Sequence, residues 1–146
     1  MPHQTTSKVK KIKEELMNIE VLIEQLKKYN WDETNVRIAL RAKCECEYCG
    51  KYMLESIDNY KLWQIDHIIP KSSVVENCED FDNKALSCTQ CNKDFKGKWY
   101  PQSVFNEKKD RSKYIDEIKE YIKKQRSKKQ KELEEIKKIF DSYYFV

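Results

Sequence analysis

The sequence contains little glycine and little proline, with 2 and 3 residues of each in a chain of 146. Long disordered linkers are therefore not expected, and the charged, glycine-poor composition favours helices. No stretch approaches the roughly 18 apolar residues of a membrane span, and the amino terminus has no apolar secretion signal. We therefore expect a cytoplasmic protein without a membrane partner.

Neither sign of charge dominates the sequence. Although 37% of the residues are charged, the net charge is only +4. This value permits nucleic-acid binding but does not argue for it, since a mixed-charge helical protein can carry it by chance. The length suits one ordinary domain with helical extensions. We expect three parts: a helical extension over 1–30, a core over 31–101 and a basic helical region over 102–146.

The first part carries a short heptad pattern over 7–29, with apolar residues at alternating steps of three and four. The residues in this seam are Val9, Ile12, Leu16, Ile19, Ile23 and Leu26. Two interpretations stay open. The helix packs on the rest of its own chain, or it forms a coiled coil that joins two copies into a homodimer.

The last part shows one apolar face at helical spacing over 110–140. Its members are Ile115, Ile118, Ile122, Leu133, Ile136 and Phe140. Between the two halves of this face lies a basic run, 123–131, without an apolar residue. The run is either a solvated stretch of helix or a stripe that contacts phosphates.

The middle part holds all six cysteines, and four of them form two C-x-x-C pairs. In a reducing compartment such spacing favours metal ligation over disulfides. Four thiolates complete a closed tetrahedral zinc shell, which stabilises a fold and leaves no position for a catalytic water. The predicted ligands are Cys46, Cys49, Cys88 and Cys91. Gly50 suits the turn because it tolerates a positive φ, while Cys44 and Cys78 are expected to be bystanders.

Between the pairs, an Asp-His step ends a strand that we predict over 62–69, rich in β-branched and aromatic residues and stopped by Pro70. The chain has 2 histidines, and His3 lies near the terminus. Imidazole chemistry near neutral pH therefore falls to His67. Asp66 is a hard oxygen ligand of the kind that Mg²⁺ or Mn²⁺ prefers.

The second cysteine pair lies at the start of a predicted helix. The S-x-x-Q form of residues 87–90 is typical of a capping box, which predicts a helix from Cys88 to about Gly97. On such a helix Cys88, Cys91 and Asn92 share one arc. Zinc would then fix the amide oxygen of Asn92 relative to the Asp-His strand. Adjacent strand residues face opposite sides, so the aspartate and the histidine should approach a substrate from different sides.

These motifs together resemble those of the HNH endonucleases of the zinc-containing, four-cysteine kind. The matching runs are C-x-Y-C-G at 46–50, D-H-I-I-P at 66–70 and N-x-x-x-x-C-x-x-C-N at 83–92. The resemblance covers about a third of the chain. It implies an α+β fold, a ββα-metal core with a four-cysteine zinc knuckle, which long N- and C-terminal helices would flank here.

The resemblance also implies a role for each matching residue. His67 corresponds to the general base, and Asp66 and Asn92 correspond to the ligands of one catalytic Mg²⁺ or Mn²⁺. Asn83 corresponds to the middle asparagine, which organises the loop and does not touch the metal. Cleavage of double-stranded DNA would leave 5′-phosphate and 3′-hydroxyl ends.

One departure from the family pattern lies after the last motif, where Phe95 or a neighbour adds a residue before Lys96 and Gly97. We consider Lys71, Lys96 and Lys98 as contacts of the phosphate backbone. Two other functions stay open: a zinc-knuckle module that binds nucleic acid without catalysis, and an HNH-type ribonuclease. The zinc ligands and the basic helix would suit the first of these equally well.

Overall fold

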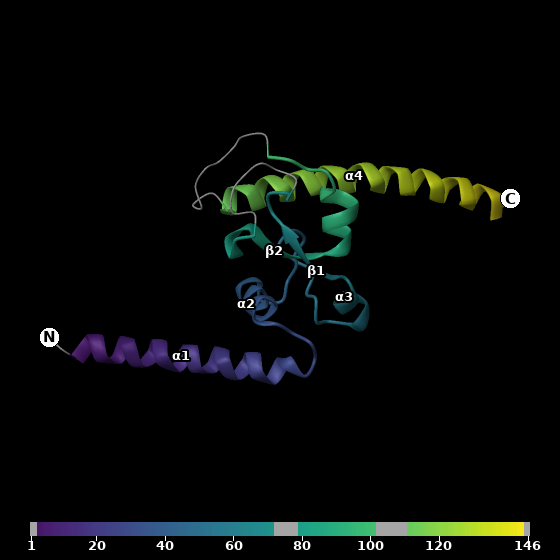
Figure 1. Cartoon of the computed structure of the whole chain (residues 1–146). Helices are drawn as coiled ribbons and strands as arrows, with labels where there is room; N and C mark the ends of the chain where they lie inside the picture. The colour runs from purple at the N-terminus through teal and green to yellow at the C-terminus, as the bar shows by residue number, and fades with distance from the viewer. Residues whose placement is uncertain (1–2, 72–78, 102–110, 145–146) are drawn as a thin grey trace. The chain divides into compact units, whose positions relative to one another are not determined.

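The computed structural model describes residues 3–71, 79–101 and 111–144. The chain forms two compact units, 1–41 and 42–146, and each is described by itself (Figure 1). Among the described helices, none has both the length and the apolar content that crossing a membrane requires.

The first unit consists of α1 (His3–Lys27) and α2 (Glu33–Ala42) without the last residue of α2. α1 confirms the helix predicted over 7–29, and the chain leaves it through Asn30, whose φ is 65°. Asp32 caps the start of α2, because its carboxylate accepts a hydrogen bond of 2.7 Å from the backbone N–H of Asn35. In the heptad seam of α1, Val9 and Ile12 are half exposed. The pairing of two copies through this seam stays a prediction.

The second unit is built on a hairpin of two antiparallel strands, which agrees with the predicted α+β class. A short helix, α3 (Ile57–Lys61), leads into β1 (Trp63–His67). A 3-10 turn, η1 (Phe81–Asn83), then leads into β2 (Lys84–Cys88). The register pairs Trp63 with Cys88 and His67 with Lys84, so the Asp-His step lies at the end of the hairpin where residues 68–83 connect the two strands.

The helix after β2 starts later than predicted. Ser87 and Cys88 belong to β2, and the Ser87 hydroxyl donates to the Cys88 carbonyl and caps no helix. The predicted capping box is therefore wrong, because strand pairing with β1 continues to Cys88. The helix, η2 (Gln90–Lys96), ends at Gly97 close to the predicted position.

η2 is wound as a π-helix, with the N–H of Gly97 donating to the carbonyl of Asn92 at 3.0 Å. A π turn spans one more residue than an α turn, and such turns are frequent at functional sites. Near the end of this helix, the Lys96 side chain is buried, with 3% of its surface exposed.

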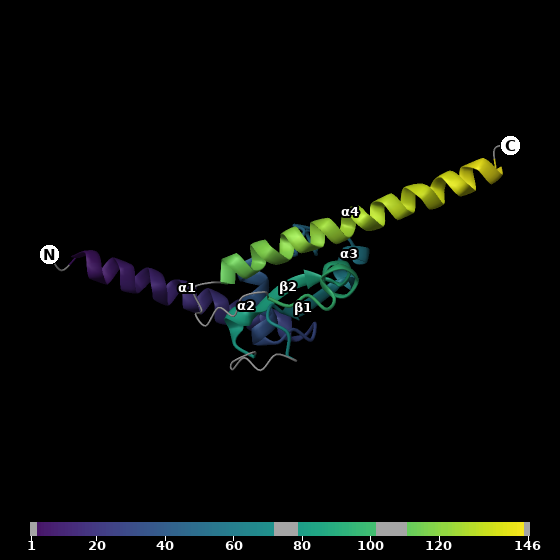
Figure 2. The same ribbon diagram turned by 90° about the horizontal axis from the view of Figure 1, so that it is seen from above.

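The long helix α4 (Arg111–Tyr144) packs against η2. The first half of its predicted apolar face is buried, through Ile115, Ile118 and Ile122, whereas the second half is exposed, with Phe140 54% exposed. In both views the C-terminal half of α4 extends beyond the strands (Figures 1 and 2). The apolar face was therefore correctly placed, but only its first half belongs to a core in the described chain.

Candidate active site and metal centre

The two cysteine pairs converge on one point between the loop before β1 and the start of η2. Their four Sγ atoms lie within 4.8 Å of one another, and Cys49 Sγ is 3.9 Å from Cys88 Sγ. A tetrahedral zinc ion with bonds of about 2.3 Å would separate its sulfur ligands by about 3.8 Å. The cluster therefore has the size of a zinc site with four cysteine ligands, formed by Cys46, Cys49, Cys88 and Cys91.

Backbone hydrogen bonds shape this cluster and reach two of its sulfurs. Gly50 adopts a φ of 77°, and its N–H donates to the Cys46 carbonyl at 2.8 Å, which closes the turn of the first pair. The N–H of Cys88 donates to Cys46 Sγ at 3.3 Å, and the N–H of Cys91 donates to Cys88 Sγ at 3.4 Å. Hydrogen bonds from neighbouring thiols, that of Cys49 first, lower the pKa of Cys46, whereas hydrogen bonds with Cys46 raise the pKa of Cys49 and of Cys91. Several thiolates this close repel one another unless a cation lies between them, and zinc meets that requirement.

Of the two remaining cysteines, the structure describes one. Cys44 is partly exposed and lies outside the cluster, as expected for a bystander. Cys78 lies outside the described residues.

An arginine of α4 contacts the cluster from outside the motifs. Arg126 donates from Nη2 to Cys91 Sγ at 3.5 Å, and its guanidinium lies 4.4 Å from the centre of the Phe95 ring. Burial, the largest single influence, opposes its charged form, but the hydrogen bond to Cys91 and the charges of the clustered cysteines together raise the pKa of Arg126. Sequence reasoning missed this residue, because its position within a basic run gave no sign of what it contacts.

Asp66 on β1 is buried, with 7% of its surface exposed, and two groups hold one of its oxygens. Tyr48 donates its hydroxyl to Oδ2 at 2.6 Å, and Lys96 Nζ lies 2.8 Å from the same atom. Burial first, and then the charge of Asp66, raise the pKa of Tyr48, which keeps its hydroxyl a donor. Among the described residues, Oδ1 of Asp66 has no hydrogen-bond partner, so this oxygen is available to a ligand.

Asn92 on η2 is held in a similar way. Its Nδ2 donates to Gln64 Oε1 at 2.9 Å, which orients the amide and leaves the Oδ1 atom for other contacts. Gln64 precedes Asp66 by two residues on β1, so both side chains lie on one face of the strand. η2 is therefore tied to that face twice, by Asn92 to Gln64 and by Lys96 to Asp66.

His67 contacts a different set of residues from Asp66, as strand alternation predicts. Its Nε2 lies 3.2 Å from Glu79 Oε1, at ion-pair distance but not at a hydrogen-bonding angle. Glu79 also lies 3.3 Å from Lys71 Nζ and 3.8 Å from Lys84 Nζ. The proximity of His67, and then of Lys71, lowers the pKa of Glu79.

Asn83 fastens the chain just beyond His67. Its Nδ2 donates to the Ile69 carbonyl at 3.1 Å, while its Oδ1 accepts from the Ile69 N–H at 2.8 Å. The backbone carbonyl of Asn83 also accepts from the Ile68 N–H at 2.8 Å. These three bonds fix the end of the hairpin, which is the kind of role that the resemblance implies for this residue.

The three lysines considered as phosphate contacts differ in their surroundings. Lys71 and Lys98 are exposed, whereas Lys96 is buried and faces Asp66. Sequence reasoning also missed Tyr48, Gln64 and Glu79. Tyr48 lies inside the first cysteine motif and could have been found there, and Gln64 shares the two-residue period of β1 with Asp66.

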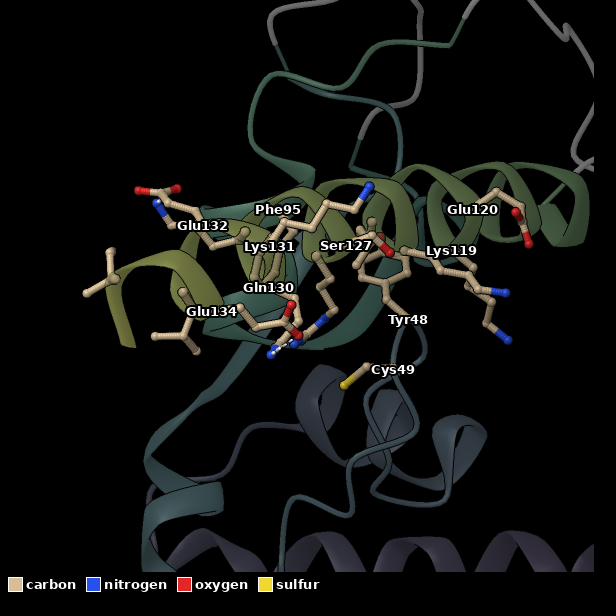
Figure 3. Close-up of a pocket in the computed structure, with 16 residues that line it drawn as sticks. Tyr48, Cys49, Phe95, Lys119, Glu120, Ser127, Gln130, Lys131, Glu132 and Glu134 are labelled. Carbon is tan, nitrogen blue, oxygen red and sulfur yellow. Dashed lines mark hydrogen bonds and ion pairs between the residues drawn. The ribbon is translucent and has the colours of Figure 1, made fainter. Parts of the chain in front are cut away.

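An open groove of about 1000 Å³ borders the zinc cluster and not the Asp66–Asn92 site. Figure 3 shows Tyr48 and Cys49 across from residues of α4 that include Gln130 and Glu134. Side chains of both charges line this groove, so it has no clear preference for an anion.

The comparisons with known proteins agree with the motifs. Residues 46–96, about a third of the chain, match the family model described as HNH endonuclease. No curated protein and no solved structure gives a significant match to the chain. The matched segment begins at the first zinc ligand and ends at Lys96, and it includes Asp66, His67 and Asn92. The segment 46–96 is therefore similar to HNH endonuclease domains, and it contains the four clustered cysteines.

Proposed function

We propose that this protein is a metal-dependent endonuclease that hydrolyses phosphodiester bonds of DNA. The observation that carries the proposal is the double attachment of η2 to one face of β1 within the HNH segment. This attachment presents a carboxylate oxygen of Asp66 and an amide oxygen of Asn92 from facing elements. One carboxylate and one amide leave most of an octahedral shell to water and phosphate oxygens, which is how Mg²⁺ prefers to bind.

A divalent ion held by Asp66 and Asn92 would stabilise the charge that develops on the phosphate and on the leaving oxygen. His67 acts as general base and accepts a proton from the attacking water at Nε2. Glu79 faces this atom, but its side chain is 65% exposed and can rotate away at little cost when a phosphate approaches. Asn83 keeps the chain after His67 in place while this happens.

Duplex DNA is the proposed substrate, and the basic run of α4 supports this choice. Its lysines are exposed, so their charge is available to a phosphate backbone. The sequence offers no aromatic platform motif of the kind that binds single-stranded RNA. RNA is nevertheless a substrate to be tested beside DNA.

A nucleic-acid-binding module without catalysis is the second candidate. The specific observation in its favour is that Tyr48 and Lys96 already satisfy one oxygen of Asp66. A buried ion pair of this kind is also found in sites with a purely structural role.

Incubation of the zinc-loaded protein with supercoiled plasmid, linear duplex and RNA, with and without Mg²⁺ or Mn²⁺, separates these possibilities. We expect metal-dependent cleavage of DNA and a loss of about 10²–10⁴-fold in rate in His67→Ala, because a general base contributes about that much. His3→Ala is the matched control, since it removes the other histidine of the chain. Zinc content and circular dichroism verify that each variant is folded. A folded His67→Ala protein that cuts DNA at the wild-type rate would exclude the mechanism.

A further inference from the structure

Asp66 and Lys96 are the two charged residues that the described chain buries almost completely, and they form an ion pair. Lys96 Nζ lies 2.8 Å from Asp66 Oδ2 and donates to the His67 carbonyl at 2.8 Å. The ring centre of Trp99 lies 5.7 Å from the same ammonium. With 3% of its surface exposed, Lys96 has its charge fixed beside Asp66.

The charges around the proposed cation site therefore cancel before any substrate arrives. Asp66 contributes one negative charge, Lys96 one positive charge, and Asn92 is neutral. On the side of His67, the carboxylate of Glu79 is already matched by Lys71 and Lys84.

A divalent ion at the Asp66 carboxylate would be repelled by the ammonium bound to the same group. At a partly buried site such repulsion is several times stronger than in bulk water. The attraction of a single carboxylate is thus largely offset, and the DNA-free protein offers the ion no net negative charge. A phosphate of the nucleic acid supplies that charge.

Building on the proposed function, we propose that Lys96 makes binding of the catalytic divalent ion depend on DNA, because it neutralises the one carboxylate ligand. The nucleic acid and the ion then bind together, each strengthening the other by the same factor. Lys96 is by this proposal a positioning residue that sets the charge of the site and does not touch the reacting atoms.

The test measures Mn²⁺ binding to the full, zinc-loaded chain by electron paramagnetic resonance, with and without a duplex oligonucleotide. The His67→Ala background prevents cleavage during the measurement. In this background we expect weak Mn²⁺ binding without DNA and binding at least about tenfold tighter with it. One interaction between close charges at a partly buried site changes an affinity by about tenfold or more. Equal affinity in both states would overturn the proposal.

Lys96→Met removes the charge but keeps most of the apolar stem. We expect it to raise Mn²⁺ affinity of the DNA-free protein by about tenfold or more, and to reduce the further gain from DNA. Lys96→Arg keeps the charge and should leave the DNA-free affinity low. Lys93→Met is the matched control, because Lys93 is an exposed lysine of the same helix. A folded Lys96→Met protein that binds Mn²⁺ no more tightly than its parent would contradict the proposal.

A second variant keeps the test decisive if Lys96→Met does not fold, since it leaves Asp66 buried without its partner. Asn92→Asp adds a negative charge at the other proposed ligand and leaves Lys96 in place. It should also raise Mn²⁺ affinity in the absence of DNA, and an unchanged affinity would overturn the proposal.

Asp66→Asn separates this inference from the proposed function. If it leaves Mn²⁺ binding to the DNA complex unchanged, the assignment of Asp66 as a ligand is wrong and both proposals fail. If it abolishes binding while the charge variants have no effect, only the role of Lys96 is wrong.

Discussion

The two metal centres of this domain differ in how completely the chain itself builds them. The zinc centre has all four of its donor atoms within 4.8 Å of one another. The proposed catalytic centre has one carboxylate and one amide, on two elements joined by side-chain bonds. The first centre would be complete once the chain folds around an ion, which suits a structural role. The second is incomplete without water and substrate, so it can serve a reaction.

A cation lies beside each centre, but with opposite consequences. Arg126 donates to Cys91 from outside the shell and offsets part of the negative charge of four thiolates around a divalent ion. Lys96 pairs with the single carboxylate of the other centre and offsets all of its charge. By the proposal above, the same type of contact would favour one ion and disfavour the other.

The largest difference between the centres should appear when metal is removed. A chelator strong enough to take zinc should unfold the unit 42–146, because structural zinc contributes on the order of 10 kcal/mol to small domains. Removal of Mg²⁺ alone should stop cleavage and leave the fold intact. Circular dichroism and thermal melting measure both effects.

Cys91→Ser should reproduce the loss of zinc, and Cys44→Ser is its matched control because Cys44 lies outside the cluster. If Cys91→Ser melts at the wild-type temperature, the zinc centre does not have the structural role assigned to it.

Replacement of Arg126 should give an intermediate effect confined to the zinc centre. Arg126→Met removes a charge-assisted hydrogen bond and a cation–π contact, and we expect it to destabilise the protein by about 1–3 kcal/mol. Urea denaturation measures this change, and a colorimetric chelator should take zinc from the variant faster.

Arg126→Lys should recover only part of the loss, since an ammonium cannot stack on Phe95 and reach Cys91 as a planar guanidinium does. Lys128→Met is the control from the exposed part of the same helix. Zinc release as slow as in the wild type would show that Arg126 is a surface residue only.

The contrast between the centres also explains what the sequence could predict. The zinc ligands follow from short spacings, and the first strand of the hairpin follows from the pattern over 62–69, so local patterns sufficed for both; the second strand was implied only by the family resemblance. The buried position of Lys96 depends on partners distant in sequence, Tyr48 and Asp66, which no local pattern reveals. The start of η2 was misplaced for a related reason, because pairing between strands overrode the capping signal at Ser87.

α4 shows the same limit on a larger scale. Its apolar periodicity was visible in the sequence, yet periodicity does not say which half of a face is covered. Burial of Ile118 and exposure of Phe140 are decided by where the neighbouring elements end.

The smallest expected effect concerns the surface of α4 that would bring DNA to the proposed catalytic centre. Neutralising four exposed lysines of α4 should weaken DNA binding uniformly across sequences and lower the salt dependence of the affinity; they are Lys123, Lys124, Lys128 and Lys129. Each lysine that contacts a phosphate should lower the slope of log affinity against log salt by about one. Filter binding over a range of salt concentrations measures the slope.

Lys137→Gln with Lys138→Gln is the matched control, because both residues are exposed on the C-terminal half of the same helix. An equal change in the two sets would mean that only overall charge matters. An unchanged slope in the first set would show that the basic run is solvated surface. A change confined to the first set would place the phosphates along the part of α4 that contains Arg126. The duplex would then lie beside the zinc centre while its phosphate completes the proposed catalytic centre. Zinc would in that case hold in place the helix that binds the substrate.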